Sequence, residues 1–232
     1  MSTQDLDTAS PLYTGTAAQW RDGAPVKAIA TYTSNATLAS IAATSFSFSS
    51  QAIGTPSSDR KVVVVTHSAT AYTHNDTVSS MTIGGISATL VVRATPASNG
   101  QLEMWEADVP SGTTATIVVN WSRSRNGCGI GAWAVTGANS STYATATDIT
   151  DPLSQTLTIP ARGCAIGGAF GFSTPTFSWT GLTENYEQNP RIDHKGTGAS
   201  ASFNQLQTDL TITAGESVFN KGAMILASWA EA

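Results

Sequence analysis

Residues 102–121 read LEMWEADVPSGTTATIVVNW, and they decide the fold class because they hold two strand patterns joined by a short turn. Both patterns are rich in apolar and β-branched residues, and the letters PSG between them are turn formers. Residues 81–93, MTIGGISATLVVR, repeat the arrangement, with Gly84 and Gly85 able to adopt the positive φ angles of a tight hairpin turn. Both stretches predict consecutive antiparallel strands.

The same strand spacing continues along the chain. Residues 61–67, KVVVVTH, form a continuous β-branched run that is typical of a strand buried on both faces. About ten to twelve short strands, with turn signals roughly every 8–12 residues, predict an all-β fold: a two-sheet antiparallel β-sandwich of jelly-roll type. The remaining strands are expected at 44–53, 128–136, 156–159, 164–172, 177–179, 201–207, 210–213 and 223–230.

Three polar stretches interrupt this pattern and are predicted to lack strand structure. Residues 123–127 are expected to be a short loop, and residues 137–152 a long crossover between sheets. Residues 181–198 are the best candidate for a functional loop, because binding residues are concentrated on loops that a rigid scaffold positions.

Aromatic and polar side chains in and beside that third stretch are candidates for contacting a glycan: Trp179, Asn185, Tyr186 and Arg191. The alternative is an ordinary surface loop without a ligand. The other tryptophans within predicted strands are expected to fill the core, as large aromatic side chains usually do. They are Trp105, Trp121, Trp133 and Trp229.

The composition limits the partners. Charged residues make up 12% of the 232 residues, about half the share of an average soluble domain, and Ser and Thr supply about a quarter of the chain. The net charge of −5 and the 11 scattered basic residues argue against nucleic acid as a partner. The first residues form no signal segment, and no apolar stretch reaches the ~18 residues of a membrane span. We therefore expect synthesis in a cytoplasm and no membrane contact.

The sequence carries no recognisable catalytic motif. The three histidines are scattered, and no Gly-x-Ser-x-Gly elbow is present. Glu103 and Glu106 are three residues apart on a strand, so they point to opposite faces and cannot flank one sugar bond. We therefore expect a protein that is not an enzyme and has no catalytic residues, metal site or cofactor.

Two cysteines, Cys128 and Cys164, lie in similar surroundings, because residues 127–131 read GCGIG and residues 163–167 read GCAIG. This echo is either a coincidence or the mark of two equivalent core strands. If those strands are neighbours, a disulfide becomes feasible once the Cβ atoms approach the ~3.8 Å that it needs. Because free cysteine is commonly buried and a cytoplasm is reducing, we favour two buried free thiols.

Residues 1–25 are polar and contain several turn formers, which predicts an extended N-terminal arm ahead of a single sandwich domain at 26–232. Tyr13 and Trp20 are the large side chains available to anchor this arm on a partner subunit. The alternative is a terminus without a partner.

The hairpin MTIGGISATLVVR, the stretch EMWEADVPSGTTATIVVNWS and the strand ending AWAVTG together resemble a β-sandwich module of proteins encoded by tailed phages, prophages and gene transfer agents. The later GCAIGGAFGF and MILASWAEA extend the resemblance over roughly residues 30–230. It implies a virion surface protein, such as a capsid decoration, a head fibre or spike, or a tail or collar appendage. It supplies no catalytic residues.

We therefore expect a structural virion component, made in a bacterial host and anchored by its N-terminal arm to capsid, tail or fibre subunits. Such proteins are expected to be homo-oligomers, because repeated lattices present repeated sites. The alternative is a carbohydrate-binding or adhesin module that attaches the particle to a host glycan. An enzyme such as a depolymerase is the third and weakest hypothesis.

Overall fold

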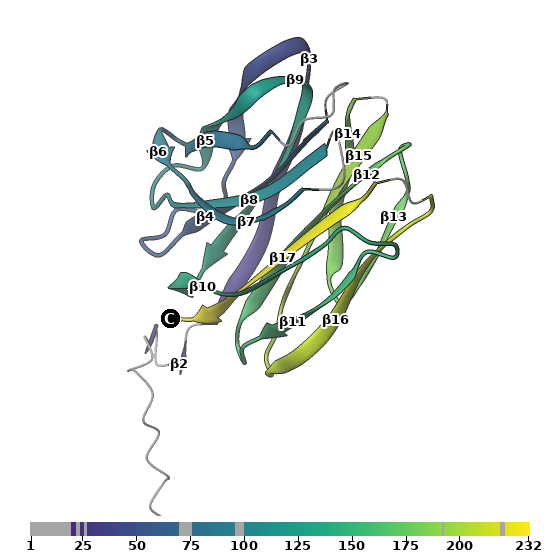
Figure 1. The fold of residues 1–232 in the computed structure, drawn as a ribbon. Coiled ribbons are helices and arrows are strands. Elements are labelled where there is room, and N and C mark those ends of the chain that lie inside the picture. The colour runs from purple at the N-terminus through teal and green to yellow at the C-terminus, as the bar shows by residue number, and fades with distance from the viewer. Residues whose placement is uncertain are drawn as a thin grey trace, which may run out of the picture.

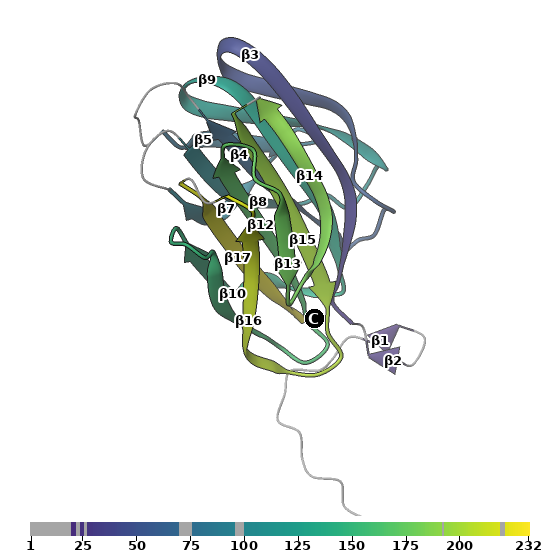
Figure 2. The same cartoon turned by 90° about the vertical axis from the view of Figure 1, so that its right-hand side faces the viewer.

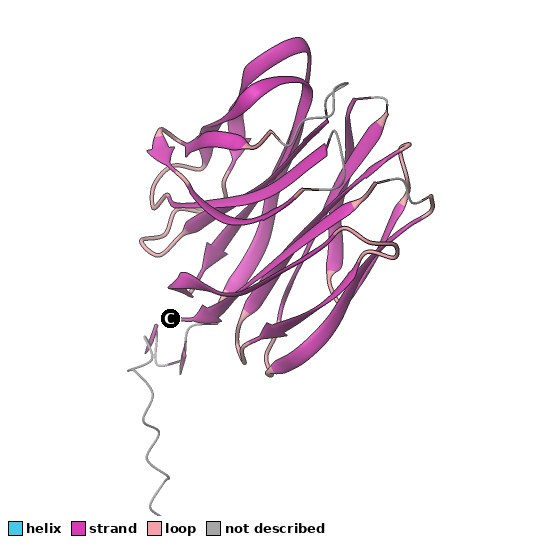
Figure 3. Ribbon diagram, viewed as in Figure 1, coloured by secondary structure: helices cyan, strands magenta, loops and turns pink. Residues whose placement is uncertain are grey.

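The computed structural model describes residues 27–69, 76–95, 100–191, 193–218 and 221–232, and the backbone of two short strands before them. Every regular element in these residues is a β-strand, and all strand pairs are antiparallel (Figures 1 and 3), so the predicted all-β antiparallel sandwich is confirmed. The strands are β1 (Trp20–Arg21), β2 (Ala24–Pro25), β3 (Ile29–Ala52), β4 (Lys61–Ala69), β5 (Val78–Ile83), β6 (Ile86–Ser87), β7 (Thr89–Ala94), β8 (Gly100–Asp108), β9 (Thr114–Thr136), β10 (Ala138–Asp148), β11 (Ser154–Ile159), β12 (Cys164–Phe172), β13 (Phe177–Thr180), β14 (Thr183–Arg191), β15 (His194–Ser202), β16 (Gln207–Glu216) and β17 (Ala223–Glu231).

The long strands β3 and β9 pair with each other along most of their length and pass from one layer to the next. The later part of β9 also pairs with β4, and its earlier part pairs with β5. The predicted loop at 123–127 is therefore wrong, because these residues continue β9. Arg125 pairs with Ala43 of β3 between two register shifts, and its buried guanidinium lies 4.7 Å from the ring centroid of Trp121.

The strands fall into two groups that we call the first half (residues 29–136) and the second half (residues 138–232). The first half contains a central sheet in the order β3–β9–β4–β8–β7, and the second half contains one in the order β10–β17–β12–β15–β14. Each central sheet has an outer layer of its own. The outer layer of the first half is formed by the other ends of β3 and β9 with β5 and β6, and that of the second half by β11–β16–β13 (Figures 1 and 2).

Both halves have the same strand order. In the first central sheet β3 pairs with β9, which also pairs with β4. In the second central sheet β10 pairs with β17, which also pairs with β12, the counterpart of β4. In the first outer layer the end of β3 pairs with the start of β9, which also pairs with β5. In the second outer layer β11 pairs with β16, which also pairs with β13. This connectivity is related to that of a jelly roll and is present twice, except that β7 and β14 pair with β8 and β15 in the central sheets. The chain thus stacks two sandwiches where the sequence predicted one pair of sheets.

The two halves pack through their central sheets in an approximately two-fold symmetric way. β3 lies against β14 while β7 lies against β10, and β9 lies against β15 while β8 lies against β17. Likewise β4 contacts β15 while β8 contacts β12. The apparent axis passes between β4 and β12, where a Cβ atom on Gly168 would lie 2.6 Å from Cγ1 of Val65.

Three hydrophobic clusters fill the spaces between the four layers. One cluster, which includes Trp133, Phe170 and Trp229, lies between the two central sheets, and the other two lie between each central sheet and its outer layer. Both faces of the central strands are therefore buried. This confirms the prediction from the continuous apolar run of β4, and it places Trp105 and Trp121 in the core as expected.

Two other predicted irregular stretches are also strands. Residues 138–148 form β10, which is hydrogen-bonded to β17 at the edge of the second central sheet, and residues 181–198 contain β14 and β15. The side chains of β10 alternate between fully and partly exposed along TYATATD, as in a strand with one solvated face. The small and hydroxylated side chains of β10 resemble those of a loop, because an edge strand with one solvated face needs few apolar residues.

We predict that Gly168→Ala destabilises the protein by about 1–3 kcal/mol, because the new methyl group collides with Val65 where the halves meet. Val65→Ala alone should cost about 2 kcal/mol through the cavity that it leaves. The double variant should lose about 1 kcal/mol less free energy of unfolding than the sum of the two single losses, as measured by denaturant unfolding. Strict additivity would show that the two residues are not in contact.

Candidate functional site

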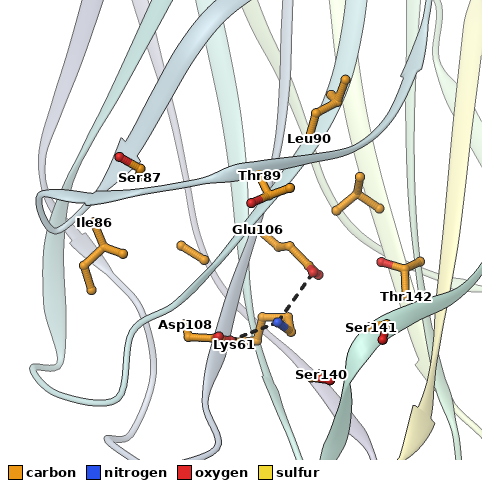
Figure 4. A pocket seen from close by; sticks show the side chains of 12 residues that line it. Lys61, Ile86, Ser87, Thr89, Leu90, Glu106, Asp108, Ser140, Ser141 and Thr142 are labelled. Atoms are coloured by element: carbon orange, nitrogen blue, oxygen red, sulfur yellow. Dashed lines mark hydrogen bonds and ion pairs between the residues drawn. The ribbon is translucent and has the colours of Figure 1, made fainter.

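An open cleft of about 530 Å³ lies where the edge of the first central sheet meets β10 of the second half (Figure 4). Its floor comes from β4 and β8, and its walls come from β6 and β7 on one side and β10 on the other. The lining residues are Lys61, Ile86, Ser87, Thr89, Leu90, Val91, Glu106, Ala107, Asp108, Ser140, Ser141 and Thr142.

The floor of the cleft carries a compact group of charges. Lys61 and Asp108 are directly opposite each other on β4 and β8, and Nζ of Lys61 lies 2.9 Å from the Asp108 carboxylate. Glu106 is two residues before Asp108 and therefore projects from the same face of β8, with its carboxylate 3.5 Å from the same ammonium group. The Lys61 side chain is only 8% exposed whereas that of Asp108 is 80% exposed, so the group runs from the interior to the rim.

Glu106 also joins the two halves of the molecule. Nε1 of Trp229, from β17 of the second half, donates a hydrogen bond of 3.0 Å to its carboxylate. Glu103 points to the opposite face of β8, as predicted, where it is fully buried and accepts a 2.8 Å hydrogen bond from Nε1 of Trp105. The two glutamates therefore do not share a site.

The approximate symmetry shows why the cleft is open. Trp133 of β9 and Trp229 of β17 are counterparts, both fully buried in the cluster between the central sheets. Trp133 is paired across the sheet with Tyr32 of β3, whereas Trp229 is paired with Thr142 of β10. The ring of Tyr32 stacks on Tyr186, with centroids 5.8 Å apart, and fills its corner of the molecule. The smaller Thr142 lines the open cleft at the corresponding corner.

Of the four residues predicted to contact a glycan, the three whose side chains the structure describes do not form one surface. Tyr186 is buried between the central sheets, and the side-chain carbonyl of Asn185 accepts hydrogen bonds from Trp133 and Ser200. Trp179 packs on the opposite side of the second central sheet, against the outer cluster. The side chain of Arg191 lies outside the described residues.

The predicted anchors of the N-terminal arm are largely outside the described residues. Tyr13 is among them, and for Trp20 only the backbone is described, where it pairs with Pro25 in the small sheet of β1 and β2. The anchoring role of both residues stays a prediction.

The two cysteines are free thiols in different clusters. Cys128 lies on β9 beneath the outer layer of the first half, and Cys164 lies on β12 between the central sheets. Their strands belong to different sheets, so the GCGIG and GCAIG stretches are not neighbours. Burial raises the pKa of each thiol to about 12.

We predict that neither cysteine reacts with a thiol reagent in the native protein at pH 8, because very little thiolate is present at a pKa of about 12. Labelling should be roughly a thousand-fold slower than in the urea-unfolded chain, where the pKa returns to about 8.5. The measurement is the labelling rate of both residues by mass spectrometry. Rapid native labelling of either one would contradict its burial.

A second polar feature, distant in the sheet from the cleft, consists of two buried histidines between the central sheets. The rings of His67 on β4 and His194 on β15 pack edge to face, with centroids 6.2 Å apart. Nε2 of His67 lies 3.2 Å from Nε2 of Gln188, and its ring occupies the space that a side chain on Gly129 or Gly196 would take. Burial, and secondarily repulsion from His194, lowers the pKa of His67 to about 3.

This shift predicts acid destabilisation. The pKa of His67 in the folded protein, about 3, lies below the value of about 6.5 for the unfolded chain, so the unfolded state binds more protons between these pH values. The free energy of unfolding should therefore fall as the pH decreases from about 6.5 toward 3, by up to about 1.4 kcal/mol per pH unit from this residue. His67→Phe should show a shallower fall in urea unfolding at pH 7, 5.5 and 4.5. Equal slopes for both proteins would exclude His67 as the source.

Within the described residues, no group of three or more His, Cys, Asp or Glu side chains lies close enough together to hold a metal ion. The same residues include no helix with the length and apolarity that a membrane span requires. Comparison of the chain with known protein families, with curated proteins and with solved structures found no match.

Proposed function

We propose that the protein is a non-catalytic structural component of the virion of a tailed phage or phage-like particle, acting as a head decoration, a head fibre or spike, or a tail or collar appendage. The observation that carries this proposal is the twofold occurrence of a jelly-roll-like sandwich in one chain. Jelly rolls occur in viral capsid and lectin domains, and also in cupins. Because a fold alone does not fix a function, the proposal also relies on the sequence resemblance to virion modules.

The packing of the halves suits a building block of a particle. Four layers enclose three hydrophobic clusters, and the central strands are buried on both faces. Such a block resists deformation because close-packed interiors transmit strain rather than absorb it. In a particle it would contact its neighbours by buried surface and by pairing of edge strands, of which β7, β10 and β14 are examples.

A second candidate function is attachment of the particle to a host-surface carbohydrate. The cleft favours it, because a concave site of this volume is typical of small-ligand sites and combines charged, hydroxylated and apolar side chains. The residues that would bind are those of the cleft rather than the predicted set around Trp179 and Tyr186.

The virion role predicts that the protein copurifies with assembled particles. Particles from the producing strain, purified on a density gradient, should contain this chain at a fixed copy number relative to the major capsid protein, measured by quantitative mass spectrometry. The expected copy number is a multiple of the symmetry of the head, collar or tail. A chain that stays in the lysate and is absent from particles would refute the structural role.

A further inference from the structure

We infer that the cleft beside β10 is a binding site for a short, neutral, hydroxyl-rich saccharide. The assignment rests on the proposed carbohydrate-binding function and goes beyond it by naming the site and the class of sugar. Three features of the cleft support it: its charges, its walls and the reason that it is open.

The charged floor selects for a neutral ligand. One ammonium group, from Lys61, faces the two carboxylates of Glu106 and Asp108, so these groups together carry one net negative charge. A phosphate, sulfate or uronic acid would be repelled. A sugar hydroxyl can donate to a carboxylate and accept from an ammonium group, so a pair of neighbouring hydroxyls matches this arrangement.

The geometry of the floor is fixed before a ligand arrives. Trp229 and Lys61 both hold the Glu106 carboxylate, which therefore does not need to be ordered on binding. Asp108 extends from the same group to the exposed rim. A preorganised acceptor gains affinity because less side-chain entropy is lost on binding.

The walls provide the remaining contacts. β10 contributes the hydroxyl-bearing residues Ser140, Ser141 and Thr142 to the wall that comes from the other half of the molecule (Figure 4). The opposite wall contributes Ile86 and Leu90, which are 41% and 37% exposed and present apolar surface to the C–H face of a sugar ring. Hydroxyl groups on one side and aliphatic groups on the other match the two kinds of surface of a saccharide.

The opening reflects smaller side chains and looser contacts between the halves, because β3 also contacts β15 and β12 whereas β10 contacts β7 without comparable contacts to β8 and β4. The symmetric counterpart of this corner is bounded by the counterpart strands β3 and β14 and is filled by Tyr32, Tyr186 and Trp133. A tyrosine in place of Thr142 is therefore compatible with this kind of corner, and it provides a variant that closes the cleft while leaving the strand pairing intact.

The test uses the full-length chain on an array of neutral oligosaccharides of glucose, galactose, mannose and rhamnose, with sialylated and uronic acid oligosaccharides as anionic probes. The affinity for the best neutral probe is then measured by calorimetry for three variants. Thr142→Tyr should weaken binding at least about tenfold, and Asp108→Asn about three- to tenfold. Thr116→Tyr is the matched control, an exposed strand threonine outside the cleft, and should bind like the wild type. Thermal melting confirms that each variant is folded.

Three results would overturn the assignment, and they separate the site from the function. If the wild type binds a neutral oligosaccharide and Thr142→Tyr binds it equally well, the cleft is not the site, although carbohydrate binding itself stands. If the wild type binds no probe, both the carbohydrate-binding function and the site fail. A preference for sialylated or uronic acid oligosaccharides would refute the neutral class.

Discussion

The close approach of the two central sheets is the constraint on which the rest of the structure depends. Large rings lie between these sheets, and those of Trp133, Tyr186 and His67 face glycines of the opposite half or of a neighbouring strand. A Cβ atom on Gly198 would lie 2.6 Å from the ring of Trp133, and one on Gly196 would overlap the imidazole of His67. The glycines of β15 therefore set the distance between the halves, because any side chain there would separate the sheets and open the cluster between them.

Burial of both sheet faces has a second consequence, since every polar group inside needs a partner. Nε, Nη1 and Nη2 of the fully buried Arg60 donate to three backbone carbonyls, and the indole groups of Trp133 and Trp229 donate to Asn185 and Glu106 across the junction between halves. These directional bonds fix how the halves sit on each other, which apolar packing alone specifies less strictly. The bond from Trp229 to Glu106 also fixes the floor of the cleft.

The fold class could be predicted from the sequence because strand spacing and β-branched runs are local signals. The buried central strands β4, β12 and β17 were found for the same reason, whereas β15 was missed although it is also central and buried, because it is rich in Gly, Ser and Ala. The edge strands β10 and β14 were missed, because Ser, Thr and Asn in a strand with one solvated face resemble a loop. The repeated strand order was also missed: the halves share topology and a tryptophan at a matching position, whereas the GCGIG and GCAIG echo joins strands that are not counterparts.

The cleft could be predicted only in part. Glu106 and Asp108 are two residues apart in a strand pattern, and Lys61 begins the apolar run of the paired strand, so a charge group on one face was within reach of sequence analysis. That this charge group meets β10 could not be predicted, because the contact depends on how the halves pack.

Since its walls come from both halves, the cleft exists only while the junction is intact. A ligand bound there would contact both halves and so stabilise their packing, which couples recognition to the stability of the whole block. The filled corner around Tyr32 can hold the halves together without such a ligand. One corner of the near-symmetric molecule is thus closed by aromatic side chains, and the other is the open cleft where the proposed saccharide would bind.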